Sequence, residues 1–496
     1  MFKVRTDDNS KFSMKLIAFT FCLLLSFYAH SKQSFSTYLI PAISGTGVEK
    51  ELSSVAGINQ PFKVLEIEPD NPESVIRLKW NSINRKSLGK KPVFRVCLAT
   101  DLRSFQKLQA KIAASEITID EIDLTMGAPF QLLELEIPQK HLNSVLKHGI
   151  DLRILGEGPE VAFFIPSSNL PESFFPHLLQ PGNVSPMEEF FTKMASLASL
   201  SSFGWQEGCV IDGLADLHKK YPHKEMFKEA LNRHLDLLFP ENTTLKHENS
   251  IEETSCIAQL ALRDSKSKYI DSVLHFWKSK EDVQGMINDE RIAAEGNYTV
   301  AWPMAVIAKQ LQRPDLAEKA IRELRMRRDS LVDKDGVLWL RHKSDDTPQK
   351  SYRLWSRGTA WYFLGLARTL DVLPNPPADL IAEYQRSAAF LVKYQRANGM
   401  FHIFMEEETT AYESSGTAGV AAALAIGIRN GWIGKDYNSY ITKAYGGLEK
   451  RLTPDGFLKG TAQTNKAEGG EAFQRKTKGA ILQFGMGMFA QLIGAM

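Results

Sequence analysis

The strongest constraint on the fold is a long series of helical segments that begins near residue 188 and contains no strand-like interruption. Val210, Leu214 and Leu217 recur at the three- and four-residue spacing of an amphipathic helix, and comparable patterns continue to residue 494. The predicted helices occupy residues 188–202, 207–220, 223–238, 251–263, 267–279, 297–311, 314–332, 355–372, 377–396, 414–430, 437–452 and 476–494. Twelve helices without intervening strands predict a mainly α fold in which six hairpins form a toroid.

The connections between these helices alternate in length. Tyr221-Pro222-His223 and Gln312-Arg313-Pro314 are short, whereas the connections that alternate with them are long and polar. The long connections are 241–250, 280–296, 333–354, 401–413 and 453–475. In a ring of hairpins this alternation places every long loop at one end. Binding and catalytic residues are commonly carried by such loops, so we expect the functional site at that end.

The preceding part of the chain has a different pattern. Short runs rich in β-branched and aromatic residues are separated by Pro and Gly, which predicts strands at 93–98, 132–137, 151–155 and 161–165, with a helix at 104–115. We therefore predict a β-rich N-terminal domain at 32–168, built as a sandwich. Residues 169–186 are rich in Pro, Ser and Asn and are predicted to be a linker to the helical domain at 187–496.

The N-terminus has the features of an export signal. Lys11 and Lys15 precede an apolar run at 16–29, and the small residues Ala29 and Ser31 follow at the position of a cleavage site. We predict a signal peptide at residues 1–31 and a secreted or periplasmic protein. The alternative is a membrane anchor, although the run is short for a spanning helix; once a signal is removed, no membrane association is expected.

Charge and cysteine content exclude several classes of function. The net charge of +2 over 496 residues provides no concentrated basic face, so no nucleic-acid partner is expected. Outside the predicted signal, Cys97, Cys209 and Cys256 are widely spaced and odd in number, which indicates buried apolar thiols rather than a disulfide framework. No His, Cys or Asp cluster has the spacing of metal ligands, so we expect neither a metal nor another cofactor.

An aromatic and arginine motif, Trp355-Ser356-Arg357-Gly358-Thr359-Ala360-Trp361, opens one predicted helix. Indole rings pack well on the apolar faces of sugars, and a guanidinium group binds a carboxylate through paired hydrogen bonds. The motif is therefore suited to a sugar acid. The alternative is a packed helix start with a surface arginine.

Other polar and aromatic residues lie in or beside the long connections. The candidates are Glu252, Glu253, Glu295, Trp302, His342 and Glu413. Each carboxylate could instead complement the dipole at a helix N-terminus. Glu413, which precedes Ser414 and Ser415, is predicted to cap its helix rather than to catalyse.

Three parts of the sequence together resemble glycoside hydrolase families 88 and 105, the unsaturated glucuronyl and rhamnogalacturonyl hydrolases. The resemblance covers roughly residues 205–494 and rests on Trp355–Trp361, on Glu413–Gly416 with the apolar helix ending at Asn430-Gly431, and on Asp335-Gly336-Val337 before His342. It implies an (α/α)6 barrel and an oligosaccharide substrate that carries a terminal 4,5-unsaturated uronic acid. It also implies vinyl-ether hydration, in which an acid protonates the double bond, water adds at C5, and the resulting hemiketal opens.

The resemblance also implies roles for individual residues. Arg357, Trp361 and His342 match substrate-binding positions, and Trp302 and Trp355 are the neighbouring aromatic candidates. Members of the families usually carry a catalytic Asp about two turns before a Pro, which is Pro303 in this sequence. Counting back reaches Gly296, so Glu295 is the predicted proton donor only if the segment holds one extra residue and Glu replaces Asp. The second acidic position falls near Glu252 or Glu253.

Two alternatives to this hydrolase remain open on the sequence. The first is another enzyme on the same toroid, either a polysaccharide lyase that uses Tyr298 and His342 or a conventional uronidase. The second is a catalytically inactive carbohydrate-binding protein that keeps Arg357 and its neighbouring tryptophans.

Overall fold

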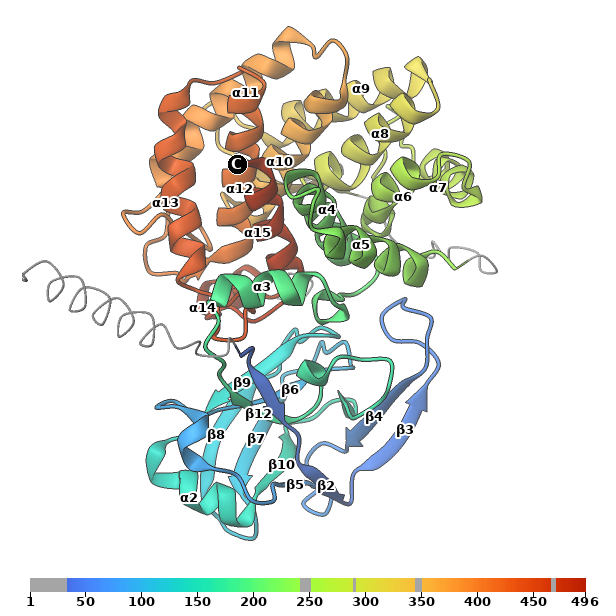
Figure 1. Ribbon diagram of the computed structural model, residues 1–496. Helices are drawn as coiled ribbons and strands as arrows, with labels where there is room; N and C mark the ends of the chain where they lie inside the picture. The colour runs from blue at the N-terminus through green and yellow to red at the C-terminus, as the bar shows by residue number, and fades with distance from the viewer. Residues whose placement is uncertain (1–33, 241–250, 289–290, 344–349, 465–469) are drawn as a thin grey trace, which may run out of the picture.

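The computed structural model describes residues 34–240, 251–288, 291–343, 350–464 and 470–496. The predicted signal peptide at residues 1–31 lies outside these ranges. Within them, each helix is too short or too polar to cross a lipid bilayer. The molecule has two parts, a helical toroid and a β-rich domain, which lie one above the other in Figure 1.

The toroid consists of an inner and an outer layer of helices that alternate along the described chain. The inner helices are α4 (Trp205–Lys220), α6 (Ile257–Arg263), α8 (Trp302–Gln310), α10 (Ser356–Val372), α12 (Ser414–Arg429) and α15 (Gln483–Ala495). The outer helices are α3 (Pro186–Met194), α5 (Glu225–Leu238), α7 (Lys268–Ser279), α9 (Pro314–Leu331), α11 (Ala378–Leu391) and α13 (Asn438–Glu449). Each inner helix packs against the next, and α15 packs against α4 to close the ring. The predicted (α/α)6 toroid is confirmed.

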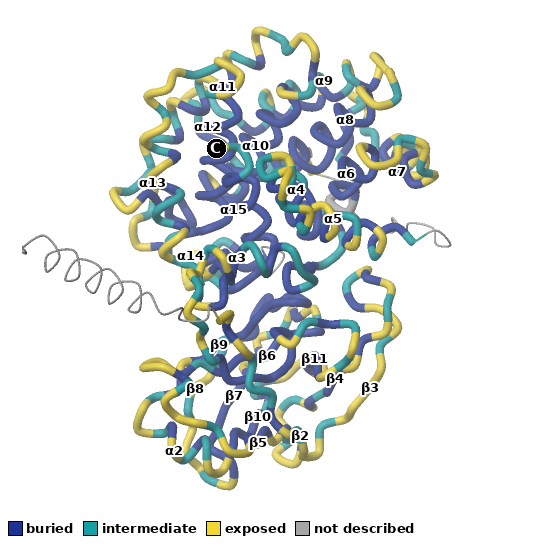
Figure 2. The backbone as a smooth tube through the Cα atoms, in the orientation of Figure 1, coloured by how far each residue is buried: buried dark blue, intermediate teal, exposed yellow. Residues whose placement is uncertain are grey.

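Inner helices differ from outer helices in composition. Most residues of α10, α12 and α15 are apolar or small, with a few buried polar side chains among them, and almost all of the residues are buried (Figure 2). A helix that is apolar all round is stable only inside a protein. Glycines allow the closest approach where the ring closes, because a Cβ added to Gly213 of α4 would collide with the backbone of Gly487 of α15. The outer helices have one apolar face and one exposed face.

The N-terminal domain consists of three antiparallel sheets around one apolar core. The sheet orders are β1-β12-β6-β9, β2-β5-β10-β7-β8 and β11-β4-β3. The strands are β1 (Thr37–Leu39), β2 (Ala42–Gly45), β3 (Val48–Leu52), β4 (Phe62–Ile67), β5 (Ile76–Lys79), β6 (Val93–Cys97), β7 (Lys107–Ile112), β8 (Thr118–Asp123), β9 (Leu132–Glu136), β10 (Ile150–Leu155), β11 (Val161–Phe164) and β12 (His177–Gln180). The predicted β-rich domain and its four predicted strands are confirmed.

Two local predictions in this half differ from the structure, and one helix was missed. The helix predicted at 104–115 is wrong, because β7 places Leu108, Ala110 and Ile112 on the buried face of a strand. Lys, Gln and Ala favour helices, but burial of this alternate set prevails. A short helix that was not predicted, α2 (Gln139–His148), lies between β9 and β10. The predicted linker at 169–186 contains β12, which pairs with β1 and β6.

The β-rich domain packs against the end of the toroid that carries the long loops (Figure 1). Ile481 pairs with Leu132 of β9, and the Gln483 amide donates a 2.7 Å hydrogen bond to the Phe130 carbonyl. On the other side of the junction, the Phe203 amide donates to the carbonyl of Ala56. Aromatic residues of the domain share one apolar core with the toroid. These residues are Phe62, Phe130, Phe164 and Phe174.

A buried ionic cluster also joins the two parts. Arg95 of β6 is completely buried and donates to Asp455 of the toroid at 2.6 Å and to Glu134 of β9 at 2.6 and 2.8 Å. The Tyr38 hydroxyl donates to the same Asp455 carboxylate at 3.0 Å. Burial alone would raise the pKa of Asp455, but the charge and hydrogen bond of Arg95 outweigh it and hold this pKa below its ordinary value.

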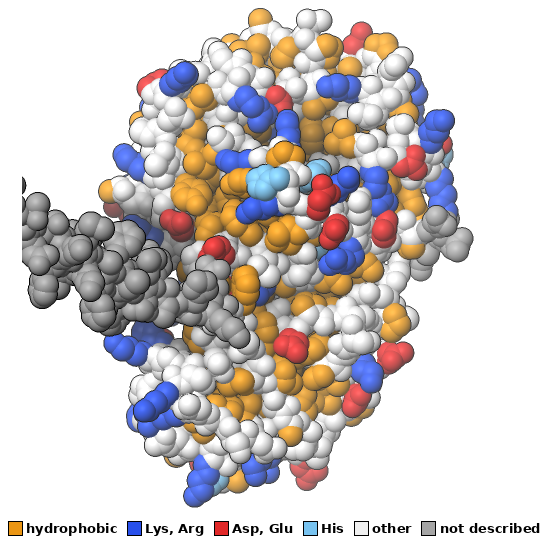
Figure 3. All heavy atoms as spheres, viewed as in Figure 1, with side chains coloured by type: hydrophobic (Ala, Val, Ile, Leu, Met, Phe, Trp, Pro, Cys, Tyr) orange, Lys and Arg blue, Asp and Glu red, His pale blue; other side chains and the backbone are white. Residues whose placement is uncertain are grey.

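On the face seen in Figure 3, acidic and basic side chains are interspersed over both parts, so neither sign of charge forms a patch there. The three described cysteines are buried and free of disulfides, as predicted, and burial raises the pKa of each thiol.

Candidate functional site

Arg357 lies in the first turn of α10, at the end of the toroid that faces the β-rich domain. Its side chain is 1% exposed, and the guanidinium group packs over the ring of Trp355 at 4.3 Å. Nη1 donates to the carbonyl of Ala462, and Nη2 donates to the carbonyl of Gln463 at 2.7 Å. A guanidinium group has five N–H donors, so these two bonds leave capacity for a ligand.

Glu413 connects the N-terminus of α12 to the residues around Arg357. As predicted, it caps α12, because its carboxylate accepts the backbone N–H groups of Ser415 and Gly416. The same carboxylate accepts the N–H of Ala462 at 3.0 Å, the residue whose carbonyl accepts from Arg357. Burial lowers the pKa of Arg357 to about 10, while the charges of Glu413 and Glu295 oppose that shift. Arg357 therefore remains a buried cation at neutral pH.

Several buried polar atoms around Arg357 have no hydrogen-bond partner among the described residues. They are the indole N–H of Trp355, the hydroxyl of Ser356 and the side-chain amide oxygen of Gln463. Buried polar groups in proteins are nearly always satisfied by protein, water or ligand. Donors and an acceptor gathered around a cation are suited to an anion that also carries hydroxyl groups.

Glu295 lies beside this cluster because of a small sheet. Strands β13 (Arg291–Ala293), β14 (Trp339–Lys343) and β15 (Lys350–Arg353) pair so that Ala293 is opposite Arg341. Glu295 lies two residues after the end of β13 and is 8% exposed, with Oε1 lying 3.5 Å from Nη2 of Arg341. Its carboxylate therefore lies within the electrostatic field of both Arg341 and Arg357. A buried carboxyl beside two cations can exchange a proton with a ligand that those cations bind.

The segment after Glu295 has an unusual backbone. Residues Asn297–Ala301 form a π-helix, η5, which continues directly into α8 at Trp302. A π-helical turn accommodates one more residue than an α-helical turn, and such turns are frequent at functional sites. The π-helical turn lies between Glu295 and Pro303, the segment in which the predicted acid position of Glu295 requires one extra residue; that position stays a prediction.

The second indole near Arg357 is not the one that the sequence motif suggested. Trp205, the first residue of α4, lies 5.7 Å from the Arg357 guanidinium, and Trp361 packs edge-on against Trp205 at 5.5 Å. Trp361 also lies 5.0 Å from the ring of Tyr298. Trp361 thus joins the cluster through Trp205, because α10 turns its side chain toward α4.

Trp302 belongs to an adjoining cluster around Asp212 of α4. Asp212 is buried and accepts hydrogen bonds from the Tyr298 hydroxyl at 2.5 Å, the Trp302 indole at 3.3 Å and the Gln259 amide at 2.6 Å. Tyr298 contacts both Asp212 and Trp361, so the two clusters adjoin in the centre of the toroid.

The structure places the remaining predicted residues less directly. His342 is half-buried in β14, and because it follows Arg341 in an extended strand, its side chain points to the opposite face of the sheet. It therefore does not share the face on which Arg341 meets Glu295. Glu252 and Glu253 belong to the short helix η4 (Ile251–Cys256), but their side chains lie outside the described part of the chain.

Trp205, Asp212 and Arg341 were not predicted from the sequence. Trp205 could have been found, because it opens an inner helix at the same end as Trp355. Asp212 is a carboxylate on the buried face of α4, and an ion so placed requires partners. Arg341 had no signal beyond its place beside His342. In the described ranges, no group of three or more His, Cys, Asp or Glu residues has the arrangement of a metal site.

Comparison with known proteins places this geometry in a family. The profile of Glycosyl Hydrolase Family 88 matches residues 185–494. The unsaturated rhamnogalacturonyl hydrolase YesR of Bacillus subtilis is 27% identical over 175 residues, or 34% of this chain and 49% of that protein. The chain thus spans about half the length of this curated relative.

Two solved structures share the fold. One, described as a possible member of glycoside hydrolase family 105 from Salmonella enterica, has 19% identity and a TM-score of 0.53, covering 59% of this chain and 82% of its own. The other, a family 105 glycoside hydrolase from C. acetobutylicum, has 20% identity and a TM-score of 0.53, covering 62% and 97%. The family match covers more than half of the sequence and confirms the resemblance found in its motifs. The chain belongs to Glycosyl Hydrolase Family 88.

Proposed function

We propose that this protein removes a 4,5-unsaturated uronic acid from the non-reducing end of oligosaccharides produced by polysaccharide lyases. The observation that carries the proposal is the convergence of Glu295 and Arg357, a buried carboxyl and a buried cation, within one family 88 toroid. The curated relative named an unsaturated rhamnogalacturonyl hydrolase supports the same chemistry.

The residues are suited to separate tasks in this reaction. Arg357 attracts the uronate carboxylate, and the unpartnered groups of Trp355, Ser356 and Gln463 supply hydrogen bonds to the sugar. Glu295 gives a proton to C4 of the vinyl ether, and the positive charge that develops is shared by C5 and the ring oxygen. Water then adds at C5 and returns a proton to Glu295. The hemiketal opens to a ketone at C5, and the hemiacetal at C1 releases the remaining sugar.

The geometry favours hydration over a lyase mechanism that uses Tyr298 as base. The Tyr298 hydroxyl donates a hydrogen bond to Asp212, and burial raises the pKa of Tyr298 well above its ordinary value. A phenol in this state is a poor proton acceptor. His342, the other residue proposed for a lyase, lies on the face of β14 opposite Arg341.

The proposal is tested with an unsaturated galacturonyl-rhamnose disaccharide. Hydration removes the ultraviolet absorbance of the conjugated double bond, whereas binding alone preserves it. Glu295→Gln should lower kcat by about 100- to 10,000-fold, the range typical of a lost general acid, while tryptophan fluorescence still reports binding. Glu318→Gln, on the exposed face of α9, is the matched control and should retain wild-type turnover. Normal turnover by Glu295→Gln would remove Glu295 from the mechanism.

We also propose that residues 1–31 direct export and are then removed, because Lys11 and Lys15, the apolar run at 16–29 and the small residues Ala29 and Ser31 follow one another in the order of an export signal. N-terminal sequencing of the protein recovered from periplasm and medium tests this proposal. A mature protein that retains Lys11 and Lys15 would contradict it.

A further inference from the structure

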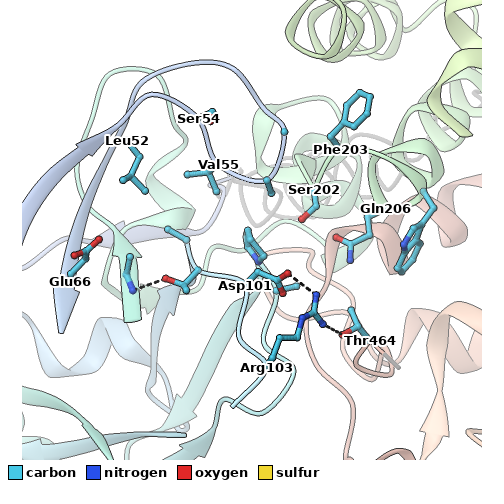
Figure 4. A pocket seen from close by; sticks show the side chains of 18 residues that line it. Leu52, Ser54, Val55, Glu66, Asp101, Arg103, Ser202, Phe203, Gln206 and Thr464 are labelled. Carbon is cyan, nitrogen blue, oxygen red and sulfur yellow. Dashed lines mark hydrogen bonds and ion pairs between the residues drawn. The ribbon is translucent and has the colours of Figure 1, made fainter. Parts of the chain in front are cut away.

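A cavity of about 560 Å3 lies between the β-rich domain and the toroid (Figure 4). This volume falls within the range of about 300–1,000 Å3 that is typical of small-molecule sites. Ser202, Phe203, Gln206 and Thr464 line it from the toroid. Asp101 and Arg103 line it from the loop that follows β6, and Ser54 lines it from the loop that follows β3.

We propose that this cavity binds the neutral sugar that follows the unsaturated uronic acid, so that the β-rich domain takes part in substrate recognition. The inference rests on the proposed function, because it names the part of the substrate that this function leaves undefined. The domain lies outside the residues matched by the family profile, which begin at 185.

The position of Trp205 connects the cavity with the candidate site. Trp205 lines the cavity and is half-buried. The same indole lies 5.7 Å from the Arg357 guanidinium and 5.5 Å from Trp361. When the acidic end of a substrate binds Arg357, its next sugar therefore lies on the other side of the Trp205 ring, in the cavity.

The lining has the chemistry of a sugar site. The rings of Trp205 and Phe203 supply apolar surface on which a pyranose face can pack. Gln206, which is 7% exposed, lies beside them with an amide that both donates and accepts hydrogen bonds. The carboxylate of Asp101 adds an acceptor from the opposite wall (Figure 4). Aromatic surface combined with a few polar groups is the usual composition of a site that binds a hydroxylated ring.

The charges of the lining favour a neutral occupant. Arg103 donates to Asp101 at 2.6 Å and to the Thr464 hydroxyl at 3.2 Å, as the dashed lines in Figure 4 mark. Glu66, which also lines the cavity, is paired with Lys50. Among the described residues of the lining, each charged group thus has an opposite charge beside it. A sulfated or carboxylated sugar needs an available cation to replace its hydration, and a neutral sugar does not.

The first experiment fills the cavity. Ser54 is exposed and lines it, whereas the exposed Ser53 does not. Two substrates are compared: the methyl glycoside of the unsaturated uronic acid, which has no second sugar, and the unsaturated galacturonyl-rhamnose disaccharide. In Ser54→Trp the kcat/KM ratio of disaccharide to methyl glycoside should fall at least about tenfold, equivalent to roughly 1.4 kcal/mol. In Ser53→Trp this ratio should stay within about twofold of wild type. Equal ratios in both variants would overturn the proposal.

The second experiment tests the charge argument. Wild type should prefer the rhamnose disaccharide over an unsaturated disaccharide with a sulfated N-acetylgalactosamine. Asp101→Asn leaves the charge of Arg103 without its counterion, so the relative kcat/KM for the sulfated substrate should rise at least about fivefold. An unchanged preference would contradict the charge argument.

The outcome also separates this inference from the proposed function. If wild type hydrates neither disaccharide, the proposed function fails, and calorimetric titration with both disaccharides then tests the cavity alone. Binding of the rhamnose disaccharide that is lost in Ser54→Trp and kept in Ser53→Trp would support the cavity. Equal binding by both variants would refute it.

Discussion

Replacement of Arg95 by Met tests how the two parts of the molecule are held together. Arg95 and Asp455 are both completely buried, and the guanidinium group bonds to both Asp455 and Glu134, while Lys459 supplies a second cation to Glu134. Removing one partner of a buried ion pair costs about 3–5 kcal/mol, because the remaining charge stays in a medium of low polarity. We expect Arg95→Met to lose about that free energy of unfolding near neutral pH, measured by urea denaturation with tryptophan fluorescence.

The pH dependence of this loss gives a sharper test. In the wild type the pKa of Asp455 is lowered, so its contribution to stability is present above the unfolded-state value of 3.8 and disappears as the pH falls through the folded-state value. In Arg95→Met, burial without the cation raises the pKa of Asp455. The stability difference between the two proteins should therefore shrink on acidification.

A double variant provides the control. Arg95→Met with Asp455→Asn removes the uncompensated charge and should recover part of the lost stability. Two results would refute the reasoning: a loss below about 1 kcal/mol in Arg95→Met near neutral pH, the size of an exposed pair, or a double variant that is less stable than the single one.

Three further predictions follow from buried contacts. Arg357→Lys should lose about 2 kcal/mol of unfolding free energy, as measured by urea denaturation. An ammonium group cannot bond to the carbonyls of both Ala462 and Gln463, and it stacks less well than a guanidinium group on Trp355. Glu413→Ala should cost about 2 kcal/mol through loss of the α12 cap, and Glu413→Gln distinctly less, by the same assay. In a chain without residues 1–31, a thiol reagent should label the native protein far more slowly than the urea-unfolded protein, because burial raises the pKa of all three remaining thiols.

The toroid was predictable because its signals are local and repeated. Helical spacing predicted the twelve helices of the two layers, although it missed α14 (Gly470–Lys476), which lies mostly in the connection predicted at 453–475. The alternation of loop lengths predicted the end at which the candidate site lies. The Glu413 cap was predictable for the same reason, since its carboxylate bonds to residues two and three positions later. The helix expected at 104–115 shows the limit of local reasoning, because the pairing of β7 with β8 and β10 determines its conformation.

The candidate site was predictable in part of its composition but not in its contacts. Arg357 was identified from its motif, yet the carbonyls that it binds lie more than 100 residues later in the chain. No spacing rule reveals such a pair. The same holds for Glu295 with Arg341, and for the meeting of Arg103 with Thr464 across the domain junction.

Closure of the toroid has a consequence for biosynthesis. The ring is completed by the packing of α15 on α4, helices from opposite ends of the family 88 region. While the ribosome is still translating the segment before α15, the apolar side of α4 that α15 will cover has no partner. Contacts between distant segments also form slowly. Nascent chains of this protein should therefore depend on chaperones until the last inner helix emerges.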